Sequence, residues 1–177
     1  MCGREPSAML RVGLESANRR RVALQFAVLA VSAGVVLAIS QMVQAWIVSW
    51  MSLGEEVGAH SPLSLEYIRN QGAAFGLFPQ FQDLFLVAAC VVSVYIVVVA
   101  PRRVRSLPLQ LALGLILGGA LSNALDRLRY GYVVDYFNIH FWPIFNTADV
   151  AICVGAIMTV AFVTWSSGGK DAGKEVP

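Results

Sequence analysis

Four apolar stretches separated by short polar segments run along the chain. The first, from Val22 to about Val48, contains no charged residue, and comparable runs cover about 84–100, 108–125 and 150–165. A helix that crosses a bilayer needs about 20 mainly apolar residues. We therefore predict an all-α membrane protein with four transmembrane helices. The second helix should stop at Pro101, because proline cannot continue a helical hydrogen-bond ladder.

The composition supports placement in a membrane. Of the 177 residues, 57% are hydrophobic and only 14% are charged, whereas soluble domains are about 25% charged. The NRRR sequence before the first stretch is typical of a signal peptide, but the stretch is too long for one, so we expect an uncleaved anchor. One four-span domain then covers residues 22–166, between cytoplasmic tails at 1–21 and 167–177. We expect the polar outer parts of both tails, 1–7 and 166–177, to be disordered.

Basic residues lie mostly on one side of the predicted spans. Ten of the thirteen Lys and Arg residues fall in the two tails and in the segment between the second and third stretches. The remaining three are Arg69, Arg127 and Arg129. Because cytoplasmic segments carry an excess of Lys and Arg, we predict that both termini are cytoplasmic and that two segments face outward. We expect no nucleic-acid partner.

The first outward segment predicts a strand. Leu63, Leu65 and Tyr67 alternate with Ser64 and Glu66, which is the period of two expected for a strand with one buried face. The NQG sequence that follows indicates a turn, because Asn and Gly tolerate a positive φ. We therefore predict a small extended (β) patch on the outer surface of the membrane.

The cysteines and histidines form no recognisable site. Cys90 and Cys153 lie in apolar runs, where a thiol usually packs as a small hydrophobic group, and Cys2 is near the N-terminus. His60 and His140 are isolated. Since no paired Cys and His spacing is present, we predict neither a disulfide nor a metal site.

Polar residues gather at the ends of the third and fourth stretches. Asp126 and Arg127 lie three and four positions after Asn123, so on a helix the three share one face, where Asp126 and Arg127 are able to neutralise each other or to satisfy nearby backbone groups. Asn146 suits the N-cap of the fourth helix, and Asp149 suits its first turn, where the helix dipole favours a negative charge. Interfacial anchoring and helix capping therefore explain several of these residues when each is taken singly.

Asp135 is harder to explain as a structural residue. It lies between Val134 and Tyr136 in an otherwise apolar stretch, where partial desolvation should raise the pKa of its carboxyl group. Asp149 follows fourteen positions later, on a segment that leaves one span and enters the next, so the two carboxylates can meet. A pair that shares one proton can activate water, which is the chemistry of an aspartic protease.

Three motifs in this order resemble the lipoprotein signal peptidases, or type II signal peptidases, of bacteria. They are NQGAAFGLF, GGALSNALDRLRYGYVVDYF and FNTADVAI, and the resemblance covers roughly residues 22–165. It implies a membrane aspartic endopeptidase that removes the signal peptide of diacylglyceryl-modified prolipoproteins just before the lipidated cysteine. It further implies the bacterial cytoplasmic membrane as location, an active site at the outer face, and no metal or organic cofactor. The expected partners are the lipid-modified prolipoprotein and membrane lipids, and we expect a monomer.

The resemblance also implies roles for individual residues. The aspartates of the VVD and NTAD sequences, Asp135 and Asp149, would be the catalytic pair. Other motif residues would bind substrate or support these carboxylates, with Asp126 as a supporting residue: Asn70, Gly72, Asn123, Asp126, Arg127 and Asn146.

Two departures from the family pattern leave alternatives open. Members usually carry Asp and Lys where this chain has Ser40 and Gln44, and Gly where it has Ser122. A non-catalytic membrane scaffold or an inactive paralogue is therefore an alternative. A proton-coupled transporter is a further one, because carboxylates inside membranes often mark proton paths. Against the transporter, the acidic residues cluster at one end of the predicted spans and leave no polar trail across them.

Overall fold

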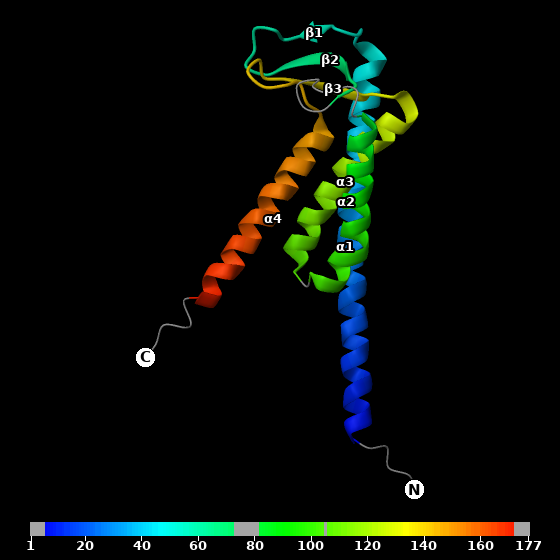
Figure 1. Cartoon of the computed structure of the whole chain (residues 1–177), viewed down its shortest axis with the longest axis vertical. Helices are drawn as coiled ribbons and strands as arrows, with labels where there is room; N and C mark the ends of the chain where they lie inside the picture. Colours follow the sequence, from blue (N-terminus) through cyan, green and yellow to red (C-terminus); the bar gives the residue numbers. More distant parts are fainter. Residues whose placement is uncertain (1–5, 73–81, 105, 172–177) are drawn as a thin grey trace.

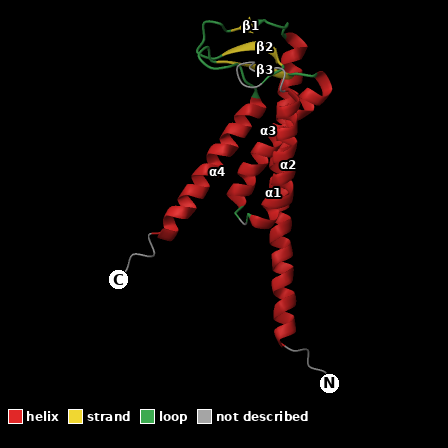
Figure 2. Cartoon of the chain, viewed as in Figure 1, coloured by secondary structure: helices red, strands yellow, loops and turns green. Residues whose placement is uncertain are grey.

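The computed structural model describes residues 6–72, 82–104 and 106–171. In these residues four helices and three strands follow one another (Figures 1 and 2). In chain order they are α1 (Pro6–Trp50), β1 (Glu56–Val57), β2 (Ser64–Asn70), α2 (Gln82–Arg103), α3 (Leu107–Tyr130), β3 (Val133–Asn138) and α4 (Thr147–Asp171). The strands lie together at one end of the helices, and α1 extends beyond the other helices at the opposite end (Figure 1).

The strands form one small antiparallel sheet in the order β1-β2-β3. The alternation that predicted a strand near Leu65 is confirmed by β2, whose register places Ile68 opposite Asp135 and Asn70 opposite Val133. The predicted turn after β2 begins with Asn70, whose side-chain oxygen accepts a hydrogen bond from the Gly72 N–H at 2.9 Å. The sheet therefore brings the end of β2 beside the first half of β3.

Helix α3 is central and contacts each of the other three helices. Small residues allow this close approach. A Cβ added to Gly118 would lie 2.5 Å from the carbonyl oxygen of Ala33 on α1, and one added to Gly119 would collide with the carbonyl oxygen of Ala148 on α4. Interfaces between membrane helices favour such small residues because they let backbones approach. The middle of α3 therefore packs closely against both α1 and α4.

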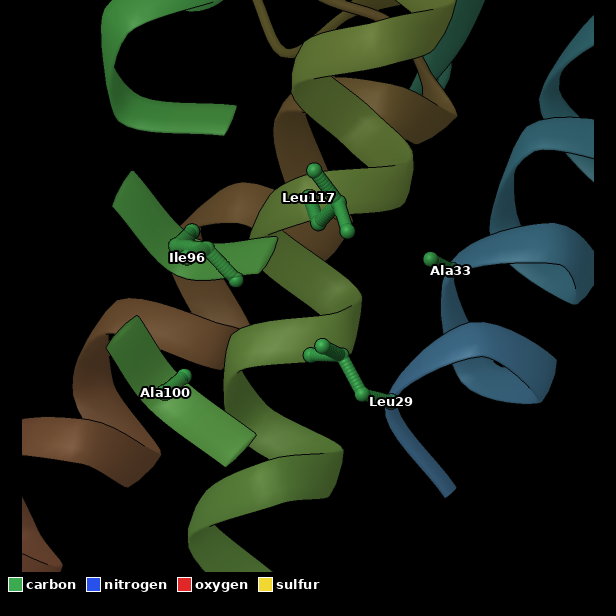
Figure 3. Close-up of a cluster of buried hydrophobic side chains, with 5 residues drawn as sticks. All are labelled: Leu29, Ala33, Ile96, Ala100 and Leu117. Atoms are coloured by element: carbon green, nitrogen blue, oxygen red, sulfur yellow. The ribbon is translucent and has the colours of Figure 1, made fainter. Parts of the chain in front are cut away.

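Two apolar clusters hold the fold together. Figure 3 shows the first, in which side chains of α1, α2 and α3 meet inside the helical part: Leu29, Ala33, Ile96, Ala100 and Leu117. The second joins the end of α1 to the sheet through Ile47, Met51, Tyr67, Val134 and Tyr136. Large apolar side chains elsewhere on the helices are exposed, for example Val91 at 63% and Ile157 at 68%. Such an exposed apolar surface suits lipid rather than water.

The described residues form four helices, as predicted, but only three of these helices contain an apolar segment of membrane-spanning length. Three segments are long and apolar enough to cross a membrane, namely Gly13–Trp50, Leu107–Tyr130 and Thr147–Trp165. The apolar part of α2, Leu86–Ala100, is shorter.

Helix boundaries also differ from those expected. Helix α2 continues through Pro101 to Arg103, because a proline removes one hydrogen bond while the Val104 N–H still donates to the Ala100 carbonyl at 2.8 Å. The expected disorder of the tails is wrong for the described residues, since α1 begins at Pro6 and α4 reaches Asp171. Extending an existing helix needs no new nucleation, so polar residues can continue it.

Candidate active site

Residues of all three motifs converge on one cavity between the sheet and the ends of α3 and α4. The cavity measures about 370 Å³. Six of the site residues predicted from the sequence line this cavity: Asn70, Gly72, Asn123, Arg127, Asp135 and Asp149. The two aspartates come from different elements, β3 and α4. Both aspartates line this one cavity, which is what a catalytic pair would require.

Asp135 is buried in the middle of this cavity wall, with 2% of its surface exposed. Each of its carboxylate oxygens accepts one amide hydrogen bond, from Asn70 Nδ2 at 2.8 Å and from Asn146 Nδ2 at 2.7 Å. Burial, followed by the negative charge of Asp149, raises the pKa of Asp135 to about 7, against the opposing effect of the two amides and of Arg127. Asp135 can therefore hold a proton near neutral pH.

Asp149 occupies the first turn of α4 in a reciprocal cap. The Asp149 N–H donates to Asn146 Oδ1 at 3.0 Å, and the Asn146 N–H donates to Asp149 Oδ2 at 3.1 Å. The predicted capping by Asn146 is thus confirmed, and it has the pattern of a capping box. The other oxygen of Asp149 accepts a hydrogen bond from Asn123 Nδ2 at 2.8 Å. A helix N-terminus favours the ionised form of such a carboxylate.

Asn146 links the two carboxylates through one amide. It is fully buried, and its Nδ2 donates both to Asp135 and, at 3.1 Å, to Asn123 Oδ1. Asn123 in turn donates to Asp149. At both positions the amide side chain donates through its nitrogen and accepts through its oxygen at the same time.

Arg127 lies at the cavity wall, where no carboxylate of the described residues contacts it directly. Its guanidinium donates to the Gly72 carbonyl at 3.2 Å and to the Asn123 carbonyl at 3.4 Å. Within the described chain it forms no ion pair with Asp126, so of the two expectations the one that holds is that these residues satisfy nearby backbone groups. The positive charge of Arg127 instead acts on Asp135 and Asp149 across the cavity.

Asp126 faces away from the cavity, although we expected it to share a face with Asn123 and Arg127. It is 1% exposed and accepts hydrogen bonds from Gln41 Nε2 at 2.8 Å and from the Val134 N–H at 3.5 Å. Asp126 therefore ties α1 and α3 to β3, directly beside Asp135.

Two of the residues that depart from the family pattern, Gln44 and Ser122, lie in this same network. Gln41 also donates to Ser122 Oγ at 3.1 Å and to Gln44 Oε1 at 2.9 Å. Ser122 is completely buried between the helices. Sequence reasoning missed Gln41, although a glutamine inside an apolar span is a signal for a buried polar partner.

A second missed contact fixes the start of α4 against β3. Tyr136 is fully buried, its hydroxyl lies 2.8 Å from Thr147 Oγ1, and it accepts a hydrogen bond from the Thr147 N–H at 3.1 Å. Trp142 and Cys153 also line the cavity and were not predicted. The sequence did offer a signal for the burial of Tyr136. Successive side chains of a strand point to opposite faces, so Tyr136 must lie on the face of β3 opposite to Asp135.

Fold and site together define a class of protein, a multispan helical membrane protein with two carboxylates in one cavity at the sheet end of its helices. Residues 32–165 match the model of the signal peptidase (SPase) II family. The lipoprotein signal peptidase of Pelotomaculum thermopropionicum is 41% identical over 143 residues, which cover 80% of this chain and 93% of that protein. The lipoprotein signal peptidase of Halothermothrix orenii is 36% identical over 130 residues, covering 73% of this chain and 90% of that protein.

A solved structure of a bacterial membrane enzyme has the same fold. It superposes with a TM-score of 0.75 at 27% sequence identity and covers 84% of this chain and 93% of that one. The chain therefore belongs to the signal peptidase II family. It is an aspartic protease of the bacterial membrane that acts in lipoprotein processing.

Proposed function

We propose that this enzyme removes the signal peptide from diacylglyceryl-modified prolipoproteins, just before the lipidated cysteine, by means of Asp135 and Asp149. The observation that carries the proposal is that both carboxylates line one cavity in contrasting surroundings. Asp135 is deeply buried between two amides, whereas Asp149 lies in a helix first turn that favours a negative charge. Two carboxyl groups whose environments separate their proton affinities are suited to acid and base roles.

In the proposed reaction Asp135 carries the proton and Asp149 is ionised. Asp149 takes a proton from a water molecule as that water attacks the scissile carbonyl carbon, and Asp135 gives its proton to the carbonyl oxygen. The resulting diol collapses when Asp149 returns its proton to the leaving nitrogen and a diol hydroxyl returns a proton to Asp135. Because the pair titrates together, its pH dependence belongs to both residues.

The supporting residues hold this arrangement before substrate arrives. Asn70 and Asn146 fix the Asp135 carboxylate from two sides, and Asn123 fixes Asp149. Arg127 contributes a positive charge and holds the Gly72 carbonyl at the cavity edge. Such preorganised donors require no rearrangement during the reaction.

We further propose that α2 is the fourth transmembrane helix. Its 22 residues would extend about 33 Å at 1.5 Å per residue, which is enough for a hydrocarbon layer of about 30 Å. With the basic tails in the cytoplasm, the sheet and the cavity lie at the outer face. A substrate anchored by two acyl chains would be held at that level, where water is also present. We propose that the enzyme acts as a monomer among membrane lipids.

Cleavage of matched substrates tests this function. Purified wild-type enzyme in detergent would be given one prolipoprotein with and one without the diacylglyceryl group, and the products weighed by mass spectrometry. We expect a signal peptide that ends at the residue before cysteine, released only from the lipid-modified substrate. An intact lipid-modified substrate after long incubation with folded enzyme would favour the scaffold or inactive-paralogue alternative.

A further inference from the structure

A second cavity lies on the other face of the β2–β3 pair. It measures about 330 Å³. Adjacent residues of a strand point to opposite faces, and here Asn70 lines the catalytic cavity while Arg69 lines the second one. On β3 likewise, Asp135 lines the first cavity and Val134 the second. The two cavities therefore share a wall but have separate linings.

Two arginines give the second cavity a positive charge. Arg69 comes from β2 and Arg129 from the end of α3, and none of the described residues that line the cavity is acidic. The Arg69 guanidinium lies 4.8 Å from the ring centre of Tyr132 and donates through Nε to Tyr67 Oη at 3.2 Å. Neither arginine forms an ion pair within the described parts of the chain. Two uncompensated guanidinium groups in one cavity are suited to binding an anion.

A buried amide lies in the wall of this cavity. Gln44 is only 5% exposed, and its Oε1 accepts a hydrogen bond from Gln41 Nε2 at 2.9 Å. Gln41 also donates to the Asp126 carboxylate at 2.8 Å. Among the described residues, Asp126 does not line the cavity, so its negative charge lies behind this wall.

The position of the cavity indicates where its ligand comes from. One wall is formed by Ala45 and Val48 at the sheet end of the apolar segment Gly13–Trp50. On the same turns, the exposed rings of Trp46 and Trp50 lie 5.3 Å apart. Exposed tryptophans at the end of a span mark the level of lipid headgroups. A cavity that opens at this level, next to apolar helix surface, meets phospholipids before it meets solutes.

We propose that the second cavity binds the phosphodiester headgroup of an anionic phospholipid. Arg69 and Arg129 contact the phosphate oxygens, and the acyl chains lie along the exposed apolar side of α1. The volume of about 330 Å³ is at the lower end of ligand cavities, so it fits a headgroup rather than a whole lipid. This proposal needs the membrane location but is independent of the cleavage reaction.

Binding of short-chain lipids to the full chain in detergent tests the proposal. Dihexanoyl phosphatidylglycerol would be titrated against wild type and Arg69→Gln/Arg129→Gln, with affinity measured by native mass spectrometry. Arg20→Gln/Arg21→Gln is the matched control, because it removes the same charge from an exposed part of α1 at the opposite end. At about 1 kcal/mol per arginine, the double variant should bind about thirtyfold more weakly, while the control binds like wild type.

Three outcomes would overturn the proposal. Equal affinity for zwitterionic dihexanoyl phosphatidylcholine would show that charge on the headgroup is not recognised. Displacement of the lipid by an equal concentration of inorganic phosphate would make the ligand a free anion. Unchanged affinity in both Arg69→Gln/Arg129→Gln and the single variant Arg129→Gln, each with wild-type circular dichroism, would remove the arginines from the site. Because the readout is binding, a failure here is distinct from a failure to cleave prolipoprotein.

Discussion

Replacing Asp135 with Asn should change how the stability of the protein depends on pH. Burial and the charge of Asp149 raise the pKa of Asp135 from its ordinary value of 3.8 to about 7 in the folded protein. The folded state therefore binds a proton more tightly than the unfolded state. A group of this kind favours folding below its unfolded pKa, and that contribution is lost as pH rises through the folded pKa. The relevant window runs from about pH 4 to about pH 7.

The size of the effect follows from the two pKa values. At 1.36 kcal/mol per pH unit, the difference between 3.8 and about 7 corresponds to about 4 kcal/mol lost by pH 8 relative to pH 4. Asn cannot ionise, so Asp135→Asn escapes this loss. Its amide nitrogen must, however, face one of the two donors, Asn70 or Asn146, which costs about 1–3 kcal/mol at all pH values.

Thermal unfolding in detergent between pH 5 and pH 8 measures this difference. We expect the apparent Tm of wild type to fall relative to that of Asp135→Asn as pH rises, and the fall to level off above about pH 7. Glu55→Gln is the control, because Glu55 is exposed and its hydrogen bond to the Ser52 N–H can be kept by Gln. A constant difference in Tm across this range would refute the reasoning about Asp135.

Three other substitutions test the surroundings of the site. Asn146→Ser keeps a capping oxygen but loses the buried donor to Asp135 and Asn123, so kcat/KM should fall about ten- to hundredfold and the unfolding free energy by about 1–3 kcal/mol; unchanged kinetics would argue against the amide as a support. Tyr136→Phe removes the hydroxyl bonded to Thr147 and should lower unfolding free energy by about 1–2 kcal/mol in denaturant titrations, and a neutral result would mean that this contact is dispensable. Gly118→Leu should prevent α3 from packing on α1, seen as loss of folded protein on gel filtration; normal yield would show that the helices can separate there.

Local patterns in the sequence predicted much of the fold. Apolar runs located the four helices, and alternation near Leu65 located β2, because both signals depend only on the residue types within one short stretch. The cap formed by Asn146 and Asp149 was also predictable, since its partners are three residues apart. Helix ends were less well predicted, as α2 passes through Pro101.

Contacts between distant segments could not be derived in the same way. The hydrogen bond of Gln41 to Asp126 spans 85 positions, and that of Asn70 to Asp135 spans 65. Both depend on how helices and strands pack, which local periodicity does not describe. The direction of the Asp126 side chain illustrates the limit. Its spacing of three positions from Asn123 predicted that the two side chains share one face of the helix. Instead, Gln41 of the neighbouring helix α1 donates a hydrogen bond to Asp126 on the other side.

Cleavage by aspartate variants tests the central claim most directly. Wild type, Asp135→Asn and Asp149→Asn, each shown to be folded by circular dichroism, would be given the same diacylglyceryl-modified prolipoprotein, with Glu55→Gln as the control. The account predicts that wild type and the control release the signal peptide and that both aspartate variants lose at least about a thousandfold in rate, because an acid or a base is absent in each. Cleavage at the wild-type rate by either folded aspartate variant would contradict the account.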